Sequence, residues 1–282
     1  MLRIDTHQHF WLYNPVKDAW ITDDMSVIQK DFLSGDIAPV LQYNDVAGCI
    51  AVQADQTEME TMFLLELAER NPFIAGVVGW VDLKADNLEE RLAYFKQYKK
   101  LKGFRHILQA EPAEFMLEDK FKKGISKLNK YGYTYDLLIK PQHLKAAEEL
   151  VSLYPNQRFV IDHMAKPLIK DKHLQPWADE ITRLAACQNV YCKISGLLTE
   201  ADWYNWQPSD FTAYLDVVFK AFGPSRIMFG SDWPVCMVAG GYNQFVKLLE
   251  EYLTRFTTAE QTLFWSENAI NFYGLSNTLH KA

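Results

Sequence analysis

The chain has 282 residues, of which 49% are hydrophobic and 23% are charged, a composition that predicts a soluble globular protein with a sizeable core. Its formal net charge is -7, and no basic run has the pattern that follows nucleic-acid phosphates, so we expect no nucleic-acid partner. No apolar run reaches the length of a membrane span, so we expect no membrane partner either.

Cysteine usage and the N-terminal sequence indicate a cytoplasmic location. The four cysteines show no CxxC spacing, and Cys49, Cys192 and Cys236 lie in or beside apolar runs. Buried free thiols of this kind suit a reducing compartment. The N-terminus opens directly into Leu2-Arg3-Ile4-Asp5, so we expect no signal peptide.

Eight short apolar runs recur along the chain. Most are rich in Val, Ile, Phe or Leu with little polar alternation, which is typical of strands buried on both faces. The predicted strands span Leu2–His7, Gly48–Ala54, Ile74–Val81, Gly103–Leu108, Thr134–Ile139, Arg158–Asp162, Val190–Ser195 and Arg226–Gly230.

The stretches between these runs show mixed helical patterns. Several begin after a plausible cap, such as Asp55, Asp86 or Ser209. The predicted helices span Glu58–Arg70, Leu88–Tyr98, Pro141–Leu153, Trp177–Cys187, Phe211–Phe222 and Gln244–Phe256.

The alternation of strands and helices predicts βαβ units and a parallel sheet. Eight strands with helical crossovers favour an α/β protein of one domain over residues 1–282, a (β/α)8 TIM barrel. An open doubly wound sheet is the alternative, although the usual nucleotide-binding glycine motifs of such sheets are absent. The long connection over residues 11–47 is either a lid or pocket wall, or an irregular cap on the barrel rim.

Polar residues at the predicted strand ends mark a candidate site, because a barrel places those ends on one rim. His7 and His9 are two positions apart, so both side chains point to the same face. With Asp232, which follows the last strand, they are candidate ligands of a divalent cation. The seventh strand ends with Lys193 and Ser195.

The candidate catalytic residues are Asp232, His163, Arg105 and His106. Asp232 suits a general base that activates water, and His163 suits polarisation of a carbonyl. Arg105 suits an oxyanion or a substrate carboxylate, but only one of Arg105 and His106 should face the barrel mouth. Asp162 should face away from His163 and serve the structure. Structural roles stay open: a loop cap for Asp232 and a hydrogen-bonded core position for His163.

Five segments carry a family resemblance: residues 4–11, 103–106, 161–167, 228–234 and 267–274. They resemble the amidohydrolase-2 group of the amidohydrolase superfamily, and most of all its sugar-lactone and dicarboxylate-lactone hydrolases. The resemblance implies a (β/α)8 barrel and metal- or water-assisted hydrolysis. By motif, His7 and His9 match the strand-1 pair, His163 the strand-6 histidine and Asp232 the strand-8 aspartate.

The chain departs from the metal-rich members of this superfamily, because its fifth strand ends in Asp136-Leu137-Leu138-Ile139-Lys140 and offers no histidine. We therefore expect one Zn²⁺ or none rather than two metals. A lactone alkoxide is a better leaving group than an amide nitrogen, so a metal-poor site favours a lactone over an amide.

We therefore expect an enzyme that opens a small lactone, preferably a sugar-acid lactone. Asp232 would activate water, while His163 with Arg105, or a metal on His7 and His9, would stabilise the oxyanion. Candidate substrate-binding residues, which could equally be barrel packing, are Gln53, Trp80, Tyr135 and Trp233.

Three alternatives to a sugar-acid lactonase stay open. One is a 2-pyrone-4,6-dicarboxylate-type lactonase, which would want several arginines at the mouth, where only Arg105 is clearly placed. A second is a metal-dependent decarboxylase on the same barrel. A third is an inactive barrel that binds sugar acids. The sequence also leaves open whether the protein is a monomer or a homodimer.

Overall fold

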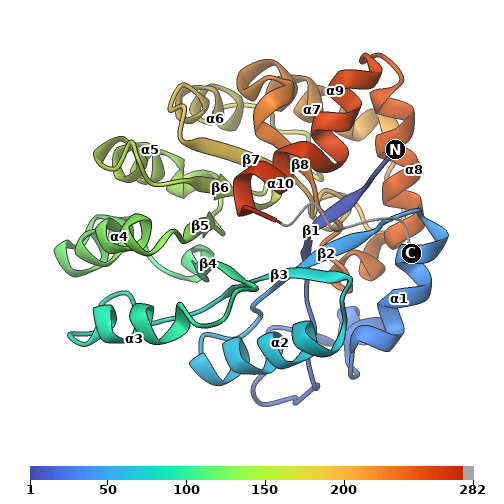
Figure 1. Cartoon of the computed structure of the whole chain (residues 1–282). Coiled ribbons are helices and arrows are strands. Elements are labelled where there is room, and N and C mark those ends of the chain that lie inside the picture. The colour runs from blue at the N-terminus through green and yellow to red at the C-terminus, as the bar shows by residue number, and fades with distance from the viewer. Residues whose placement is uncertain (276–282) are drawn as a thin grey trace.

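In the computed structural model, which describes residues 1–275, eight parallel strands alternate with helices around a central axis (Figure 1). The strands pair in chain order from β1 to β8, and a bridge between Gln8 and Trp233 links the two edges into a nearly closed barrel. The strands are β1 (Ile4–Gln8), β2 (Gly48–Val52), β3 (Ile74–Gly79), β4 (Leu101–His106), β5 (Thr134–Leu137), β6 (Phe159–Ile161), β7 (Val190–Ile194) and β8 (Ile227–Phe229). The predicted (β/α)8 TIM barrel is confirmed, and the open sheet is excluded.

Helices cover the outside of the barrel. The six predicted helices are present, with ends shifted by a few residues. The helices are α1 (Ser34–Tyr43), α2 (Glu58–Arg70), α3 (Leu88–Phe95), α4 (Asp119–Tyr131), α5 (Leu144–Leu153), α6 (Trp177–Ala185), α7 (Pro208–Phe222), α8 (Tyr242–Leu253), α9 (Thr258–Thr262) and α10 (Asn268–Tyr273).

The predicted set lacks four helices: α1, α4, α9 and α10. Helix α1 lies inside the long connection over residues 11–47, which also holds a 3-10 helix over Asp23–Ile28. This connection is therefore a rim loop followed by an ordinary barrel helix. The helix pattern of α1 was obscured by an internal proline, Pro39, and by a glycine in its first turn, Gly35.

The core has two parts. One lies between the strands and the surrounding helices, and the other fills the barrel interior with side chains such as Ile50, Val78 and Met228. The interior part continues into α10, whose Phe272 and Tyr273 are buried against it. Helix α10 thus closes the N-terminal end of the barrel and leaves the opposite rim for the site.

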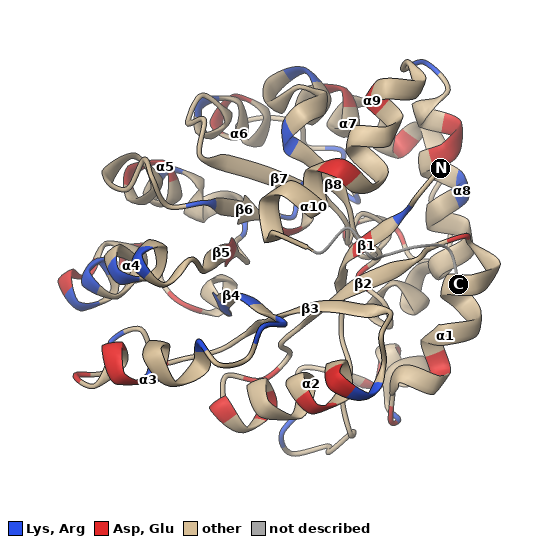
Figure 2. Cartoon of the chain, viewed as in Figure 1, with Lys and Arg blue, Asp and Glu red and all other residues tan. Residues whose placement is uncertain are grey.

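The outer helices carry both signs of charge (Figure 2). Between α3 and α4, for example, Glu89 lies 3.6 Å from the ammonium of Lys127 and 2.9 Å from that of Lys130. Exposed pairs of this kind contribute little to stability. Within residues 1–275, no helix is long and apolar enough to cross a membrane.

Candidate active site

Four of the sequence-predicted site residues converge at the C-terminal rim of the barrel. The Oδ1 atom of Asp232 lies 3.4 Å from Nε2 of His9 and 3.8 Å from Nε2 of both His7 and His163. All four side chains are buried. A carboxylate enclosed by three imidazoles is a geometry suited to proton transfer or to cation binding.

The closure of the barrel places this cluster. The backbone N–H of Asp232 donates to the carbonyl of His7, and that of His9 donates to the carbonyl of Trp233, both at 2.7 Å. These bonds join the end of β1 to the segment after β8. Asp232 itself has a φ of 60°, in the left-handed region that a non-glycine residue adopts at a cost.

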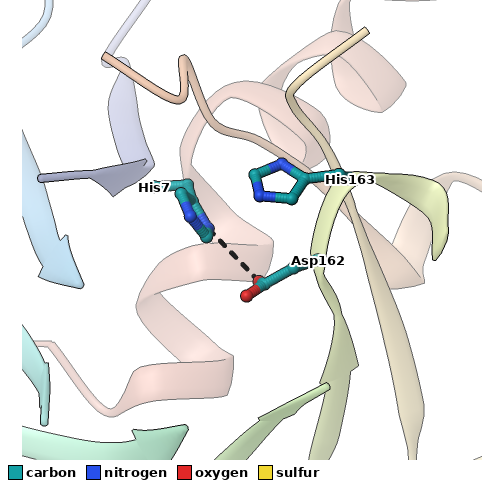
Figure 3. Close-up of side chains that lie close together, drawn as sticks. All are labelled: His7, Asp162 and His163. Carbon is teal, nitrogen blue, oxygen red and sulfur yellow. Dashed lines mark ion pairs between the residues drawn. The ribbon is translucent and has the colours of Figure 1, made fainter. Parts of the chain in front are cut away.

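A left-handed turn after β6 directs His163 into the site. Four successive residues, His163 to Lys166, have positive φ values between 51° and 58°. Because this turn interrupts the alternation of the strand, Asp162 and His163 both point toward His7 (Figure 3). The expectation that Asp162 faces away from His163 was therefore wrong: it assumed a regular strand.

Asp162 belongs to a fully buried ionic layer beneath the rim. Its Oδ2 atom accepts from Nη1 of Arg105 at 3.1 Å, and its Oδ1 atom lies 3.2 Å from Nδ1 of His7 and 3.0 Å from Nζ of Lys193. Lys193 also contacts Oδ2 of Asp136 at 2.6 Å. The sequence signal for this layer is the presence of charged residues within otherwise apolar strands.

The charge states follow from burial and from neighbouring groups. Burial by itself raises the pKa of Asp232, but His163 and His9 outweigh it, so that pKa is lowered. Burial holds the pKa values of His7 and His163 well below the ordinary value for histidine. At neutral pH the site therefore presents an ionised Asp232 beside the neutral imidazoles of His7 and His163.

His7, His9 and Asp232 fit one divalent cation, since their ligand atoms lie within 4.8 Å of one another. Nδ1 of His9 lies 2.8 Å from the carbonyl oxygen of Val52, so its N–H donates there and the Nε2 lone pair faces Asp232. Lone pair and carboxylate are both acceptors, and a cation between them satisfies both. Two imidazoles and a carboxylate form a donor set that Zn²⁺ accepts.

A pocket of about 370 Å³ opens above this cluster, within the size range of small-molecule sites. His9, Arg105, His163 and Asp232 form part of its lining. Four further polar or aromatic lining residues were not named as site residues from the sequence because they lie on loops with no regular pattern: Trp20, Gln56, Gln109 and Lys166. Trp20 belongs to the connection over residues 11–47, for which a pocket wall was one of the two expectations.

Two of these loop residues have defined partners. The side-chain oxygen of Gln56 accepts from the backbone N–H of Ile107 at 2.7 Å, which leaves the amide NH₂ group for other partners. The ammonium of Lys166 lies 3.2 Å from Oε1 of Glu200.

Gln53, His106 and Trp80 lie outside the residues that line this pocket. Gln53 is fully buried, and its amide donates to the backbone oxygen of Arg105 at 3.0 Å. Arg105 faces the barrel interior, so His106 turns outward, where its ring stacks on Phe115 and its Nδ1 accepts from the indole N–H of Trp80. These side chains support the rim.

Tyr135 and Trp233 also lie outside this lining. Tyr135 is fully buried between rings of α4 and β6, because its neighbour Asp136 takes the inward position on β5. Trp233 packs its ring against Phe10 and Phe32, away from the pocket lining.

The fold and the site define a barrel hydrolase with a histidine–aspartate centre. The amidohydrolase family model matches residues 4–275. The chain belongs to the amidohydrolase family.

Curated relatives span the whole chain. It is 39% identical to a protein of Burkholderia multivorans named L-fucono-1,5-lactonase, over 97% of this chain and 96% of that protein. It is 35% identical to a protein of the same name from Burkholderia ambifaria, over 96% and 95% of the two chains. A crystal structure of an amidohydrolase from Burkholderia multivorans with bound zinc superposes with a TM-score of 0.94, at 39% identity, over 98% of this chain and 100% of that one.

Proposed function

We propose that this chain hydrolyses a sugar-acid lactone. The observation that carries the proposal is the enclosure of Asp232 by His7, His9 and His163 at the floor of a pocket of about 370 Å³. The two relatives named L-fucono-1,5-lactonase, which align along nearly the whole chain, support the substrate class.

In the proposed reaction, Asp232 takes a proton from the attacking water as the water adds to the lactone carbonyl. The lowered pKa of Asp232 keeps its carboxylate ionised for this step. The tetrahedral intermediate then collapses, the ring C–O bond breaks, and the proton passes from Asp232 to the leaving alkoxide. The product is the open-chain hydroxy acid.

His163 and Arg105 are the proposed donors to the developing oxyanion. The Ser195 hydroxyl lies 2.9 Å from Nδ1 of His163; if it donates there, the imidazole proton sits on Nε2, which faces Asp232. The guanidinium of Arg105 is fixed beside His7 by Asp162 and lines the same pocket. A Zn²⁺ held by His7, His9 and Asp232 would polarise the carbonyl as a Lewis acid.

The pocket walls supply the proposed substrate contacts. We assign sugar hydroxyls to the amides of Gln56 and Gln109 and a ring face to Trp20, all of which line the pocket. Among the described residues, only Arg105 and Lys166 bring positive charge to the lining, and Lys166 is paired with Glu200. This favours a neutral polyol over a dicarboxylate.

A panel of 1,4- and 1,5-aldonolactones, followed with a pH indicator, tests the proposal. We expect acid release from at least one of them, and loss of activity after chelation that added Zn²⁺ restores. Turnover of a carboxylated pyrone with none of the aldonolactones would instead support the dicarboxylate alternative. Release of CO₂ from an aromatic acid would support a decarboxylase.

We also propose a cytoplasmic location, because all four cysteines are free in the structure.

A further inference from the structure

Lys193 lies in the interior of the barrel and has no exposed surface. Its ammonium contacts Oδ2 of Asp136 at 2.6 Å and Oδ1 of Asp162 at 3.0 Å. A charge is removed from water at a cost of several kcal/mol, so a fully buried lysine is retained only where fixed partners compensate it. The reaction proposed above gives this side chain no task.

The partners of Lys193 are themselves fixed from both ends of the barrel. Tyr273, on α10 at the closed end, donates its hydroxyl to Oδ2 of Asp136 at 2.9 Å. Arg105, on the side of the rim, donates to Oδ2 of Asp162 at 3.1 Å. The ammonium therefore sits between two carboxylates that cannot easily turn away from it.

This layer orients His7. Nδ1 of His7 lies 3.2 Å from Oδ1 of Asp162, and Nη1 of Arg105 lies 3.2 Å from Nε2 on the other side of the ring. Nζ of Lys193 also lies 3.2 Å from Nδ1, but Asp162 can only accept, so it favours the neutral ring with its proton on Nδ1, donated to Asp162. Nε2 then carries the lone pair of the ring, and this atom faces both Arg105 and Asp232.

His7, Asp162 and His163 would otherwise form a second group able to hold a divalent cation, since their ligand atoms also lie within 4.8 Å of one another. Lys193 and Arg105 already contact Asp162 at 3.0 and 3.1 Å. A divalent cation bound to Asp162 would lie within a few ångströms of two fixed positive charges, and that repulsion opposes binding.

We propose that Lys193 is a built-in cation that takes the place of a second divalent metal and positions His7 for the single site formed with His9 and Asp232. It is a positioning residue, acting through Asp162. The inference deepens the proposed function by fixing the site as mononuclear, and it rests on that proposal only for the role of His7.

The first test is the zinc content of the Lys193→Met variant, which has a side chain of similar length without charge. With the ammonium gone, Asp162 keeps the guanidinium of Arg105 but loses one of its two fixed positive neighbours, so less repulsion opposes a second divalent cation on His7, Asp162 and His163. We expect elemental analysis after desalting to find one more Zn²⁺ per chain than in the wild type, and Zn²⁺ to raise the melting temperature of the variant more than that of the wild type. Equal zinc content in the folded variant and the wild type would overturn the proposal.

A second variant, Lys193→Met/Asp136→Asn, removes the charge together with its nearest partner and keeps the protein testable if the single variant does not fold. Because His7, Asp162 and His163 all remain, we again expect one more Zn²⁺ per chain, and a zinc affinity at the site of His7, His9 and Asp232 lowered 10- to 100-fold, as when other supports of a metal-binding histidine are removed. Wild-type zinc affinity in this variant would contradict the positioning role.

Lys102→Met is the matched control, because Lys102 also lies on a barrel strand but its ammonium donates to the backbone oxygen of Gly274 at the other end of the barrel. Its zinc content and affinity should equal those of the wild type. Since none of these measurements needs a lactone, a failure of the proposed substrate class would not affect them.

Discussion

At the scale of single residues, the chemistry depends on the surroundings of Asp232. Burial disfavours its charge, yet the neighbouring His163 and His9 lower its pKa. The lowered pKa makes this carboxylate a weaker base than one in solvent, so its proposed role depends on its being ionised and held in position beside the pocket.

Asp232→Asn should lower kcat for the lactone by about 10²- to 10⁴-fold, the usual contribution of a positioned general base. The amide keeps the shape of the side chain but cannot take a proton. Initial rates on the best aldonolactone measure the effect, and the melting temperature checks that the variant is folded. A weaker substrate affinity with an unchanged kcat would instead indicate that Asp232 has only a binding role.

At the scale of elements, the left-handed turn after β6 places the His163 ring against the loop that follows β7. Gly196 follows β7 with a φ of 62°, and a Cβ atom there would lie 2.6 Å from Nδ1 of His163. The His163 ring also contacts the hydroxyl of Ser195 on the same loop. The loop after β7 thus packs against the imidazole of His163 and holds it in position.

Gly196→Ala should therefore destabilise the protein by about 1–3 kcal/mol, from backbone strain and the clash together, and should lower kcat by displacing His163. Urea unfolding and lactone kinetics measure the two effects. Gly35→Ala is the matched control, since a Cβ atom at Gly35, in the first turn of α1, meets nothing within 4 Å. Equal stability and rates in the two variants would show that the loop after β7 does not position His163.

Helix α2 holds a rim loop through a buried acid. The carboxylate of Glu60 accepts from the backbone N–H groups of Ala54 and Asp55, just after β2. Burial raises its pKa from 4.5 to about 7, although these hydrogen bonds and Lys17 act in the opposite direction, while Asp55 adds a small further increase. The folded state therefore binds this proton more tightly than the unfolded chain does.

Glu60 therefore lowers the free energy of unfolding as pH rises from about 4.5 to about 7, by on the order of 2–3 kcal/mol. Glu60→Gln, which can still accept from the loop, should remove this part of the slope and be more stable than the wild type at pH 8. Urea midpoints across that pH range test it, with the exposed Glu66→Gln as the control. An unchanged slope in Glu60→Gln would be the contrary result.

At the scale of the whole molecule, the sequence predicted the barrel from its periodicities, and it predicted the four-residue cluster from the positions of its members at strand ends and from their motifs. Strand and helix alternation sets the fold, and His7 and His9 share a face through the two-residue period of a strand. Predictions failed where the backbone leaves those periods. The positive φ values of residues 163–166 turned Asp162 into the site, and loop residues such as Gln109 became pocket walls.

Two of the candidate site residues lie next to an inward-facing residue. Tyr135 and His106 have neighbours, Asp136 and Arg105, that occupy the interior, so both turn toward the helices. A sequence shows that adjacent residues alternate, but it does not show which of two polar neighbours faces inward. That choice depends on partners from distant strands, here Asp162 and Lys193.

Those distant partners also connect the closed end of the barrel to the active rim. Tyr273 donates to Asp136, Asp136 contacts Lys193, Lys193 contacts Asp162, and Asp162 contacts His7. Since Tyr273 belongs to α10, the C-terminal helix stabilises a charge network that reaches the site through the full depth of the barrel.

Tyr273→Phe should cost about 1.5–3 kcal/mol of unfolding free energy, because it removes a buried hydrogen bond to a charged group while keeping the ring packed. Tyr214→Phe is the matched control: its hydroxyl donates to the neutral backbone oxygen of Leu168 at 3.3 Å, and its loss should cost about 0.5–1.5 kcal/mol. Urea unfolding of both variants measures the difference. If Tyr273→Phe cost no more than Tyr214→Phe, the network would not depend on α10, and the barrel floor and the rim would be energetically independent.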